Sequence, residues 1–160
     1  MNVSRAMRGF TLIELVVTVA IVGVLAGIAV PTVELVVQRN NEQELRAALR
    51  EIRRGIDAYK QAFDEGRILK SADASGYPPS LRVLVEGVDD ARSAQKRRIQ
   101  FLRRIPRDPM SLDTGSPPEQ TWGVRGYDSD ADEPSEGRDV FDVYSKSRSV
   151  GLNRVPHKQW

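Results

Sequence analysis

Asp128, Asp130 and Asp132 occupy alternate positions of the chain, and Glu133 follows directly. Carboxylates at this spacing can converge on Ca²⁺, a hard cation that takes six to eight oxygen ligands. The twelve-residue loop of an EF-hand is not completed, because Ala131 precedes Asp132 and no glycine holds the sixth position. We interpret the segment as an acidic, solvated turn, and we predict no bound metal or cofactor, with calcium as the open alternative.

The residue types needed for most catalytic and zinc sites are missing. The chain has no cysteine and one histidine, His157. This excludes Cys/His nucleophiles, structural zinc and any Ser-His-Asp arrangement with a choice of histidine. A glycine-rich phosphate loop is absent as well. We therefore predict that the protein is not an enzyme.

A basic run, SAQKRRIQFLRRIPRDPMS, covers residues 93–111 around the apolar anchors Ile99, Phe101 and Leu102. Basic runs with an aromatic residue can indicate nucleic-acid binding, but the whole chain has a net charge of only +2. We interpret this run as a solvated or subunit-facing patch and predict no nucleic-acid partner.

Glu14 lies inside an apolar run. From Phe10 to Val30 all residues except Glu14 are apolar, glycine or threonine. In a helix this run spans about 31 Å, which matches a bilayer core of ~30 Å. An ionisable group there is costly and calls for a partner, unless it reaches the interface. The run contains no Lys, Arg or His, so we expect the partner to come from another molecule.

The same run predicts the topology. It is too long for the apolar part of a signal peptide, and no cleavage site follows it. Arg5 and Arg8 precede it without any acid, which predicts a cytoplasmic N-terminus and a following domain on the other side of the membrane. We read it as a retained transmembrane helix, with lipid as its first surroundings.

The helical pattern continues beyond this run. Pro31 removes one helix hydrogen bond, so we expect a kink or a locally melted turn there. A single apolar stripe then recurs in steps of four and three, and it predicts an amphipathic helix whose stripe faces a core. The stripe consists of Leu45, Leu49, Ile52, Ile56, Tyr59 and Phe63. Gly66 in DEGRI is placed to end this helix.

The remaining residues predict a small mixed domain. The segment LRVLVEG, residues 81–87, reads as a short helix that ends at Gly87. Residues 120–127 and 139–147 alternate apolar and polar side chains as half-buried strands do, and residues 149–155 indicate a weaker third strand. Antiparallel strands laid on the amphipathic helix would bury its stripe, so the predicted fold class is α+β.

The N-terminal residues RGFTLIELVVTVAIVGVLAGIAVP, from Arg8 to Pro31, resemble the start of type IV pilins and type II secretion pseudopilins. These families carry a short basic leader that ends in Gly, then Phe, an acidic residue four positions later, and an apolar helix with a Pro. Here the matching residues are Gly9, Phe10, Glu14 and Pro31. Three further stretches resemble the major pseudopilin of type II secretion: YPPSLRVLVEG, FLRRIPRDPMS and FDVYS.

The resemblance implies a pilin-like fold, cleavage between Gly9 and Phe10 by a prepilin peptidase, and N-methylation of Phe10. It also implies that the new amine pairs with Glu14 of a neighbouring subunit, and that Glu14 and Pro31 serve assembly. Major pseudopilins bind calcium in a loop after the Tyr-Ser strand. The corresponding residues 146–160 contain no acid here, so that site is not carried over. The absence of cysteine also excludes the disulfide loop of many adhesive pilins.

We therefore predict a leader at 1–9, a membrane and filament-core helix at 10–31, its amphipathic continuation at 32–66 and a globular head at 67–160. The predicted function is a structural subunit of a type II secretion pseudopilus in the inner membrane, with a periplasmic head. Its partners would be prepilin peptidase, copies of itself, minor pseudopilins and the assembly platform. A type IV pilus minor pilin and a membrane-anchored binding module remain alternatives.

Overall fold

The computed structural model describes residues 10–69, 74–95, 97–130 and 132–160, and only the backbone at 28–32. The chain divides into two compact units, residues 1–39 and residues 40–160. We call the second the head unit and describe each unit by itself. The predicted leader, residues 1–9, lies outside the described residues, and the predicted domain boundaries stay predictions.

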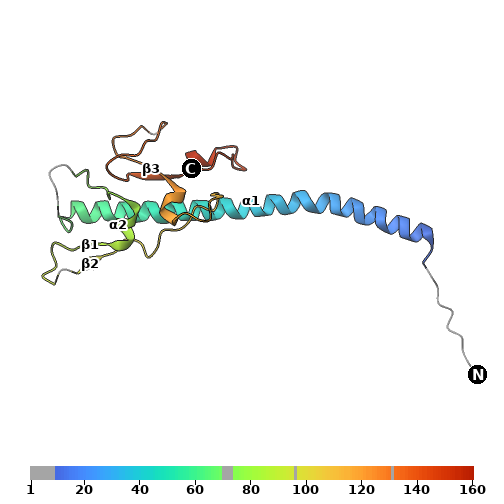
Figure 1. The fold of residues 1–160 in the computed structure, drawn as a ribbon, viewed down its shortest axis with the longest axis horizontal. Helices are drawn as coiled ribbons and strands as arrows, with labels where there is room; N and C mark the ends of the chain where they lie inside the picture. The colour runs from blue at the N-terminus through green and yellow to red at the C-terminus, as the bar shows by residue number, and fades with distance from the viewer. Residues whose placement is uncertain (1–9, 70–73, 96, 131) are drawn as a thin grey trace, which may run out of the picture. The chain divides into compact units, whose positions relative to one another are not determined.

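Helix α1 runs from Leu12 to Asp64 (Figure 1). Its backbone is helical through Pro31, so of the two expectations there the locally melted turn is wrong, whereas the kink stays a prediction. The helix continues across the one hydrogen bond that a proline cannot donate. The side chain of Pro31 itself lies outside the described residues.

The C-terminal end of α1 has the geometry of a Schellman motif. Gly66 adopts a φ of +71°, and its N–H donates to the Phe63 carbonyl at 2.9 Å. The Arg67 N–H donates to the Ala62 carbonyl, also at 2.9 Å. Glycine reaches this left-handed backbone conformation without steric cost, which confirms Gly66 as the stop signal.

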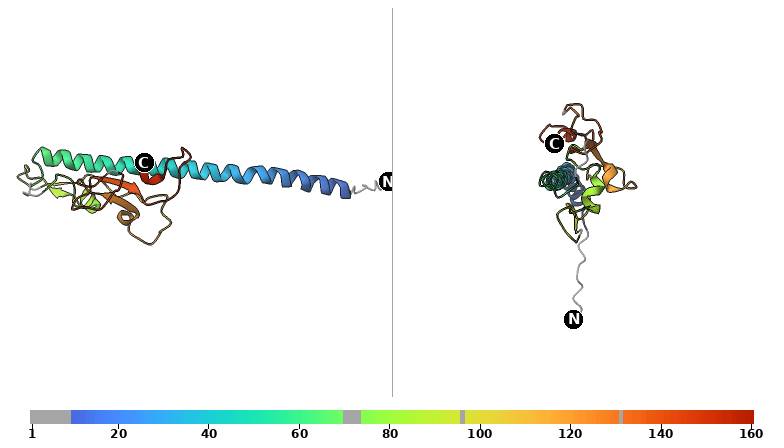
Figure 2. Two further views of the ribbon diagram at one scale, coloured as in Figure 1. Left: turned by 90° about the horizontal axis from the view of Figure 1, so that it is seen from above. Right: turned by 90° about the vertical axis from the view of Figure 1, so that its left-hand side faces the viewer.

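The predicted apolar stripe of α1 is the core of the head unit. Leu45 and Ile52 are fully buried, and Leu49, Ile56 and Tyr59 are nearly so. Phe63 is partly buried against the same core. In the end-on view the rest of the head lies on one side of α1 (Figure 2, right), as a one-sided stripe requires.

Two short antiparallel ladders and a short helix cover the stripe. Helix α2 spans Leu81–Glu86, as the sequence predicts. Strands β3 (Trp122–Arg125) and β4 (Asp142–Ser145) pair with Val124 opposite Val143. Strands β1 (Val88–Asp89) and β2 (Arg98–Ile99) form the second ladder. A long helix with small antiparallel sheets confirms the α+β fold class.

The third predicted strand, residues 149–155, is wrong. Only an isolated bridge joins Val150 to Pro156. The chain turns between them, where the Gly151 N–H donates to the Val155 carbonyl at 2.9 Å and Arg154 has a φ of +64°. The segment then enters a 3₁₀ turn, η2 (His157–Gln159). It turns back on itself rather than extending along β4, so no third ladder can form.

Polar side chains connect the loops of the head to its strands. Asp108, almost fully buried, accepts a hydrogen bond from the Ser145 hydroxyl at 2.7 Å and from the Met110 N–H at 2.8 Å. The backbone N–H of Asp108 donates to Thr121 Oγ1. Thr121 is the last residue of the other 3₁₀ turn, η1 (Pro118–Thr121). Buried polar atoms need such partners, so Asp108 fixes the long loop between β2 and β3.

One ion pair connects the end of α1 to the β1–β2 ladder. The Arg67 guanidinium donates to Asp90 Oδ2 at 2.7 Å. This hydrogen bond lowers the pKa of the Asp90 carboxyl below its ordinary value. The contact keeps the basic residues after β1 close to the helix end.

We expect the head unit, expressed from residue 40 onward, to fold without residues 1–39. Ile52→Asp should unfold it, because the change removes a fully buried apolar side chain and buries an unpaired charge. The combined cost of several kcal/mol is a large part of a typical domain stability of about 5–15 kcal/mol. Circular dichroism during thermal unfolding measures this. The matched control is Arg50→Asp at an exposed position on the same helix, which should stay folded.

Candidate functional site

The start of α1 is closed by a reciprocal pair of hydrogen bonds between Thr11 and Glu14. The Glu14 N–H donates to Thr11 Oγ1 at 3.3 Å. In return, Glu14 Oε2 accepts from the Thr11 N–H at 3.0 Å and from the Thr11 hydroxyl at 2.9 Å. This is a capping box, in which a Thr before the first helical residue and a Glu three positions later satisfy each other's backbone donors.

The capping box corrects one part of the sequence interpretation. Glu14 was expected to have no partner in its own chain, yet Thr11 is a hydrogen-bonding partner. The signal was present as Thr-x-x-Glu immediately before an apolar run. The partner is neutral, however, and the carboxylate keeps its charge beside the positive end of the helix dipole.

One oxygen of Glu14 is left available. Both Thr11 donors bond Oε2, while no donor among the described residues bonds Oε1. In the same part of the chain no Lys or Arg lies within ion-pair distance of this exposed carboxylate. A cation from outside the described chain can therefore approach Oε1 without breaking the capping box.

Phe10 precedes the capping box and is 87% exposed. Together with Leu15, Thr18, Val19 and Val22 it lines an apolar hollow of about 370 Å³ on the side of α1. Gly9 lies outside the described residues, so the structure places neither the predicted cleavage site nor its backbone.

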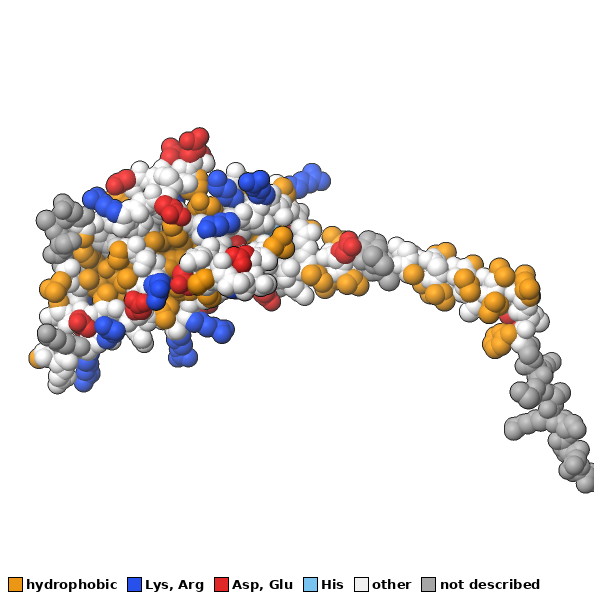
Figure 3. Space-filling view, viewed as in Figure 1, with side chains coloured by type: hydrophobic (Ala, Val, Ile, Leu, Met, Phe, Trp, Pro, Cys, Tyr) orange, Lys and Arg blue, Asp and Glu red, His pale blue; other side chains and the backbone are white. Residues whose placement is uncertain are grey.

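Apolar side chains cover much of the face of the first part of α1 that Figure 3 shows. Large exposed apolar residues on the first four turns are Leu12, Ile13, Leu15, Val16, Val17, Val19, Ile21, Val22, Val24 and Leu25. A continuous apolar surface of this extent marks a site of contact with lipid or protein. This surface and the capped carboxylate at its start form the candidate functional site.

None of the helices contains, within the described residues, an apolar stretch long enough to cross a membrane. The predicted span covers residues 10–31, and the side chains of 28–31 lie outside the description. The membrane-spanning helix therefore stays a prediction.

The acidic turn that could hold calcium has other contacts. Asp128 lies 3.7 Å from Arg138, and Asp130 Oδ1 accepts the Asp132 N–H at 2.9 Å. Nowhere in the described chain do three acidic or histidine side chains converge on one point. Two acids that follow the turn in the sequence have protein contacts as well: Asp139 accepts the Tyr127 N–H, and Asp142 contacts Arg53 and Arg125.

Residues 149–160 are held against α1 by a set of hydrogen bonds and ring contacts. Glu42 Oε1 accepts the Leu152 N–H at 2.8 Å and lies 3.7 Å from His157 Nε2. Arg53 donates to the Trp160 carbonyl at 2.7 Å, and the Arg46 guanidinium stacks 4.3 Å from the centre of the Trp160 ring. We call this set of contacts the clasp. Its residues are Glu42, Arg46, Arg53, Leu152, His157 and Trp160.

The clasp gives roles to residues that sequence reasoning passed over. His157 is buried and packs edge-on against Trp160, with ring centres 4.8 Å apart. Arg53 also donates to Asp142 Oδ1 at 2.7 Å, so it joins β4 and the segment after it to the helix. The available signal was Glu42, which lies three residues before Leu45 and therefore in line with the apolar stripe, but only the fold brings it to this segment.

Comparison with known proteins agrees with this arrangement. Residues 4–30 match the family model described as the prokaryotic N-terminal methylation motif. The chain therefore carries the N-terminal methylation motif of prepilin-type proteins, and Phe10, Thr11 and Glu14 lie within the matched residues.

Two relatives identify the family. The type II secretion system core protein G of Klebsiella pneumoniae is 30% identical over 111 residues, which cover 66% of this chain and 71% of that protein. The protein of the same name from Vibrio cholerae serotype O1 is 28% identical over 116 residues, covering 71% and 72%. The chain belongs to the type II secretion system core protein G family, which confirms the resemblance. No solved structure matches it.

Proposed function

We propose that this protein is a structural subunit of a type II secretion pseudopilus and assembles into a helical filament. The observation that carries the proposal is the combination of a charged, capped Glu14 with a bare apolar helix surface. A filament core of packed helices would cover that surface and supply the missing cation. The family membership supports the secretion system over a type IV pilus.

The proposed maturation follows from the N-terminal motif. Prepilin peptidase would cut between Gly9 and Phe10 on the cytoplasmic face of the inner membrane, and Phe10 would be N-methylated. The apolar helix would hold the subunit in the lipid with its head in the periplasm until assembly. Minor pseudopilins and the inner-membrane platform would then be its assembly partners.

Assembly would use the free side of the Glu14 carboxylate. The methylated amine of Phe10 from one subunit would approach Oε1 of the next, while Oε2 keeps its bonds to Thr11. Removing one partner of a buried ion pair costs about 3–5 kcal/mol, so only one axial offset between adjacent helices would be favourable. The pair would thereby set the register of the filament.

Maturation is tested by the mass of the protein. We expect the membrane fraction to contain a chain of 151 residues, 160 minus the nine of the leader, that begins with methylated Phe10. Intact-mass spectrometry measures this directly. Gly9→Trp should leave the precursor uncut, because the peptidase would no longer find a small residue before the cleaved bond. A mature protein that retains residues 1–9, or is cut near Val30, contradicts the proposal.

Assembly is tested by separating the charge of Glu14 from the capping box. Glu14→Ala should be inserted and processed, yet the yield of sheared filaments should fall at least about tenfold, since the partner amine is left unpaired. Thr11→Val is the control: it removes the capping hydroxyl, at about 1 kcal/mol, and keeps the carboxylate. It should assemble nearly as the wild type does. An equal loss in both variants would assign the effect to the cap instead.

We further propose that the head unit is stable without calcium. Support comes from Asp128 and Asp130 of the acidic turn, whose carboxylates have protein partners, and from the clasp, which holds residues 149–160 through Glu42, Arg46 and Arg53. The two guanidinium groups beside Asp142 also disfavour a second cation there.

The head unit should therefore melt at the same temperature in millimolar calcium and in a chelator. Arg53→Ala should lower the midpoint by several degrees in both, since the lost bonds are worth about 1 kcal/mol for a partly exposed guanidinium. Arg54→Ala, the neighbouring exposed arginine, is the control and should change little. A clear rise with calcium would make Asp128, Asp130 and Asp132 the first candidates. Their triple Asn variant would then have to abolish the rise.

A further inference from the structure

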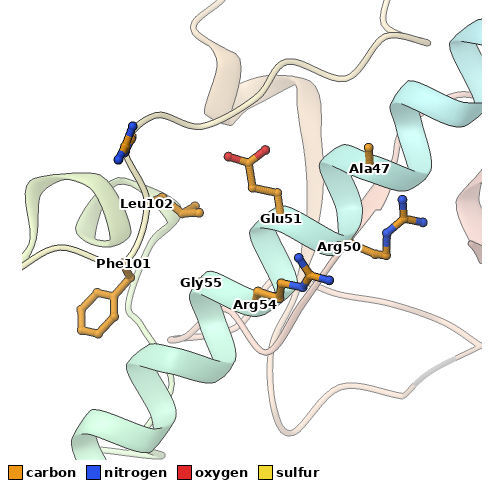
Figure 4. A pocket seen from close by; sticks show the side chains of 8 residues that line it. Ala47, Arg50, Glu51, Arg54, Gly55, Phe101 and Leu102 are labelled. Atoms are coloured by element: carbon orange, nitrogen blue, oxygen red, sulfur yellow. The ribbon is translucent and has the colours of Figure 1, made fainter.

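A groove of about 610 Å³ lies between α1 and residues 101–103 of the head unit (Figure 4). Its floor is apolar and consists of Ala47, Gly55, Phe101 and Leu102. Gly55 allows the two walls to approach, because a Cβ there would meet Leu102 Cγ at 2.8 Å. A larger residue at position 55 would push the two walls apart.

The rim of the groove is basic. Arg50 and Arg54 stand one helical turn apart on α1, Arg103 lies on the facing segment, and all three are exposed. Glu51 is the one acid among the lining residues. Unlike Arg53 and Arg67, these three guanidinium groups have no carboxylate within ion-pair distance in the described part of the chain. Arginine stays charged and prefers planar carboxylate partners, so the rim is suited to an acidic peptide.

The acidic loop between β3 and β4 has the complementary charge. Its acids are exposed and consist of Asp128, Asp130, Asp132, Glu133 and Glu136, with Arg138 as the one nearby base. None of the residues that line the groove belongs to this loop. The loop of the same head unit therefore does not fill the groove.

We propose that the groove binds the acidic loop of a second copy of this chain. The proposal rests on the proposed function, because it adds a contact between head units to the contacts of the filament core. The two surfaces consist of different residues, so each copy offers one of each to its neighbours. Such a head-to-tail contact continues into an open helical array where the rotation does not close a ring, whereas a self-complementary patch would stop at a dimer.

The strength of this contact depends on the filament. Single exposed ion pairs are weak, and salt screens them. Neighbouring heads held at high effective concentration by their packed helices would make several such pairs at once. The groove thus selects the neighbour and its rotation around the filament axis, while the helices hold the assembly together.

Disulfide trapping tests the contact in the full chain, which has no native cysteine. Ala47→Cys lies in the groove and Ser135→Cys in the acidic loop, and both positions are exposed and uncharged. We expect copies carrying one or the other, with different tags, to cross-link under mild oxidation in assembling cells. Ala47→Cys combined with Ser149→Cys, an exposed position outside the loop, is the matched control and should not cross-link.

Charge reversal tests whether opposite charges hold the groove and the acidic loop together. Arg50→Glu with Arg54→Glu should reduce the cross-linked product about tenfold, and so should Asp130→Arg with Asp132→Arg. Combining the two reversed pairs should restore the product to within about threefold of the original. Arg148→Glu, an exposed arginine outside the groove, is the control and should leave the product unchanged.

The outcomes separate this proposal from the proposed function. Wild-type chain that forms no sheared filaments would contradict the filament itself. Wild-type filaments without an Ala47–Ser135 cross-link, or with a cross-link that survives both reversals, would overturn the groove proposal and leave the filament standing. A groove cysteine that is captured only by another protein would overturn it as well.

Discussion

Burial of the stripe from Leu45 to Tyr59 on α1 is the interaction on which the head unit depends. These side chains face α2, the two short ladders and the long loops, none of which has enough apolar surface to fold alone. Helix α1 therefore supplies a large part of the buried core of the head unit, although its other face is exposed.

The capping box shows how the start of this helix can be stable while its carboxylate remains available for an ion pair. Thr11 Oγ1 accepts the Glu14 N–H, and Glu14 Oε2 accepts the Thr11 N–H and hydroxyl, so the pair satisfies two of the backbone donors that a helix start leaves unpaired. The carboxylate is thereby oriented without being neutralised. An oriented group loses less conformational freedom when it meets its partner. This favours an ion pair of one defined geometry over a nonspecific attraction.

The sequence was sufficient for features that repeat along the chain or occupy a short motif. The stripe, the Gly66 stop and helix α2 follow from periodicity and glycine placement, and the Phe10–Glu14 motif identifies the family. The clasp was not predictable, because Glu42 and Leu152 are joined only after the intervening chain has folded. The misread strand at 149–155 has the same cause: alternation suggested a ladder, but the clasp turns the segment toward the helix instead.

The clasp has a kinetic consequence for the head unit. Glu42 and Leu152 are separated by 110 positions, and Arg53 and Trp160 by 107. Contacts of such sequence separation carry a large loop-closure entropy and slow the folding of small domains. Helix α1 and its nearest loops can order first, whereas the clasp closes only when residues 149–160 have been synthesised and have reached the helix. The clasp therefore acts mainly on the unfolding rate of the folded head unit. That rate limits how fast proteases can degrade the unit when cleavage outpaces refolding.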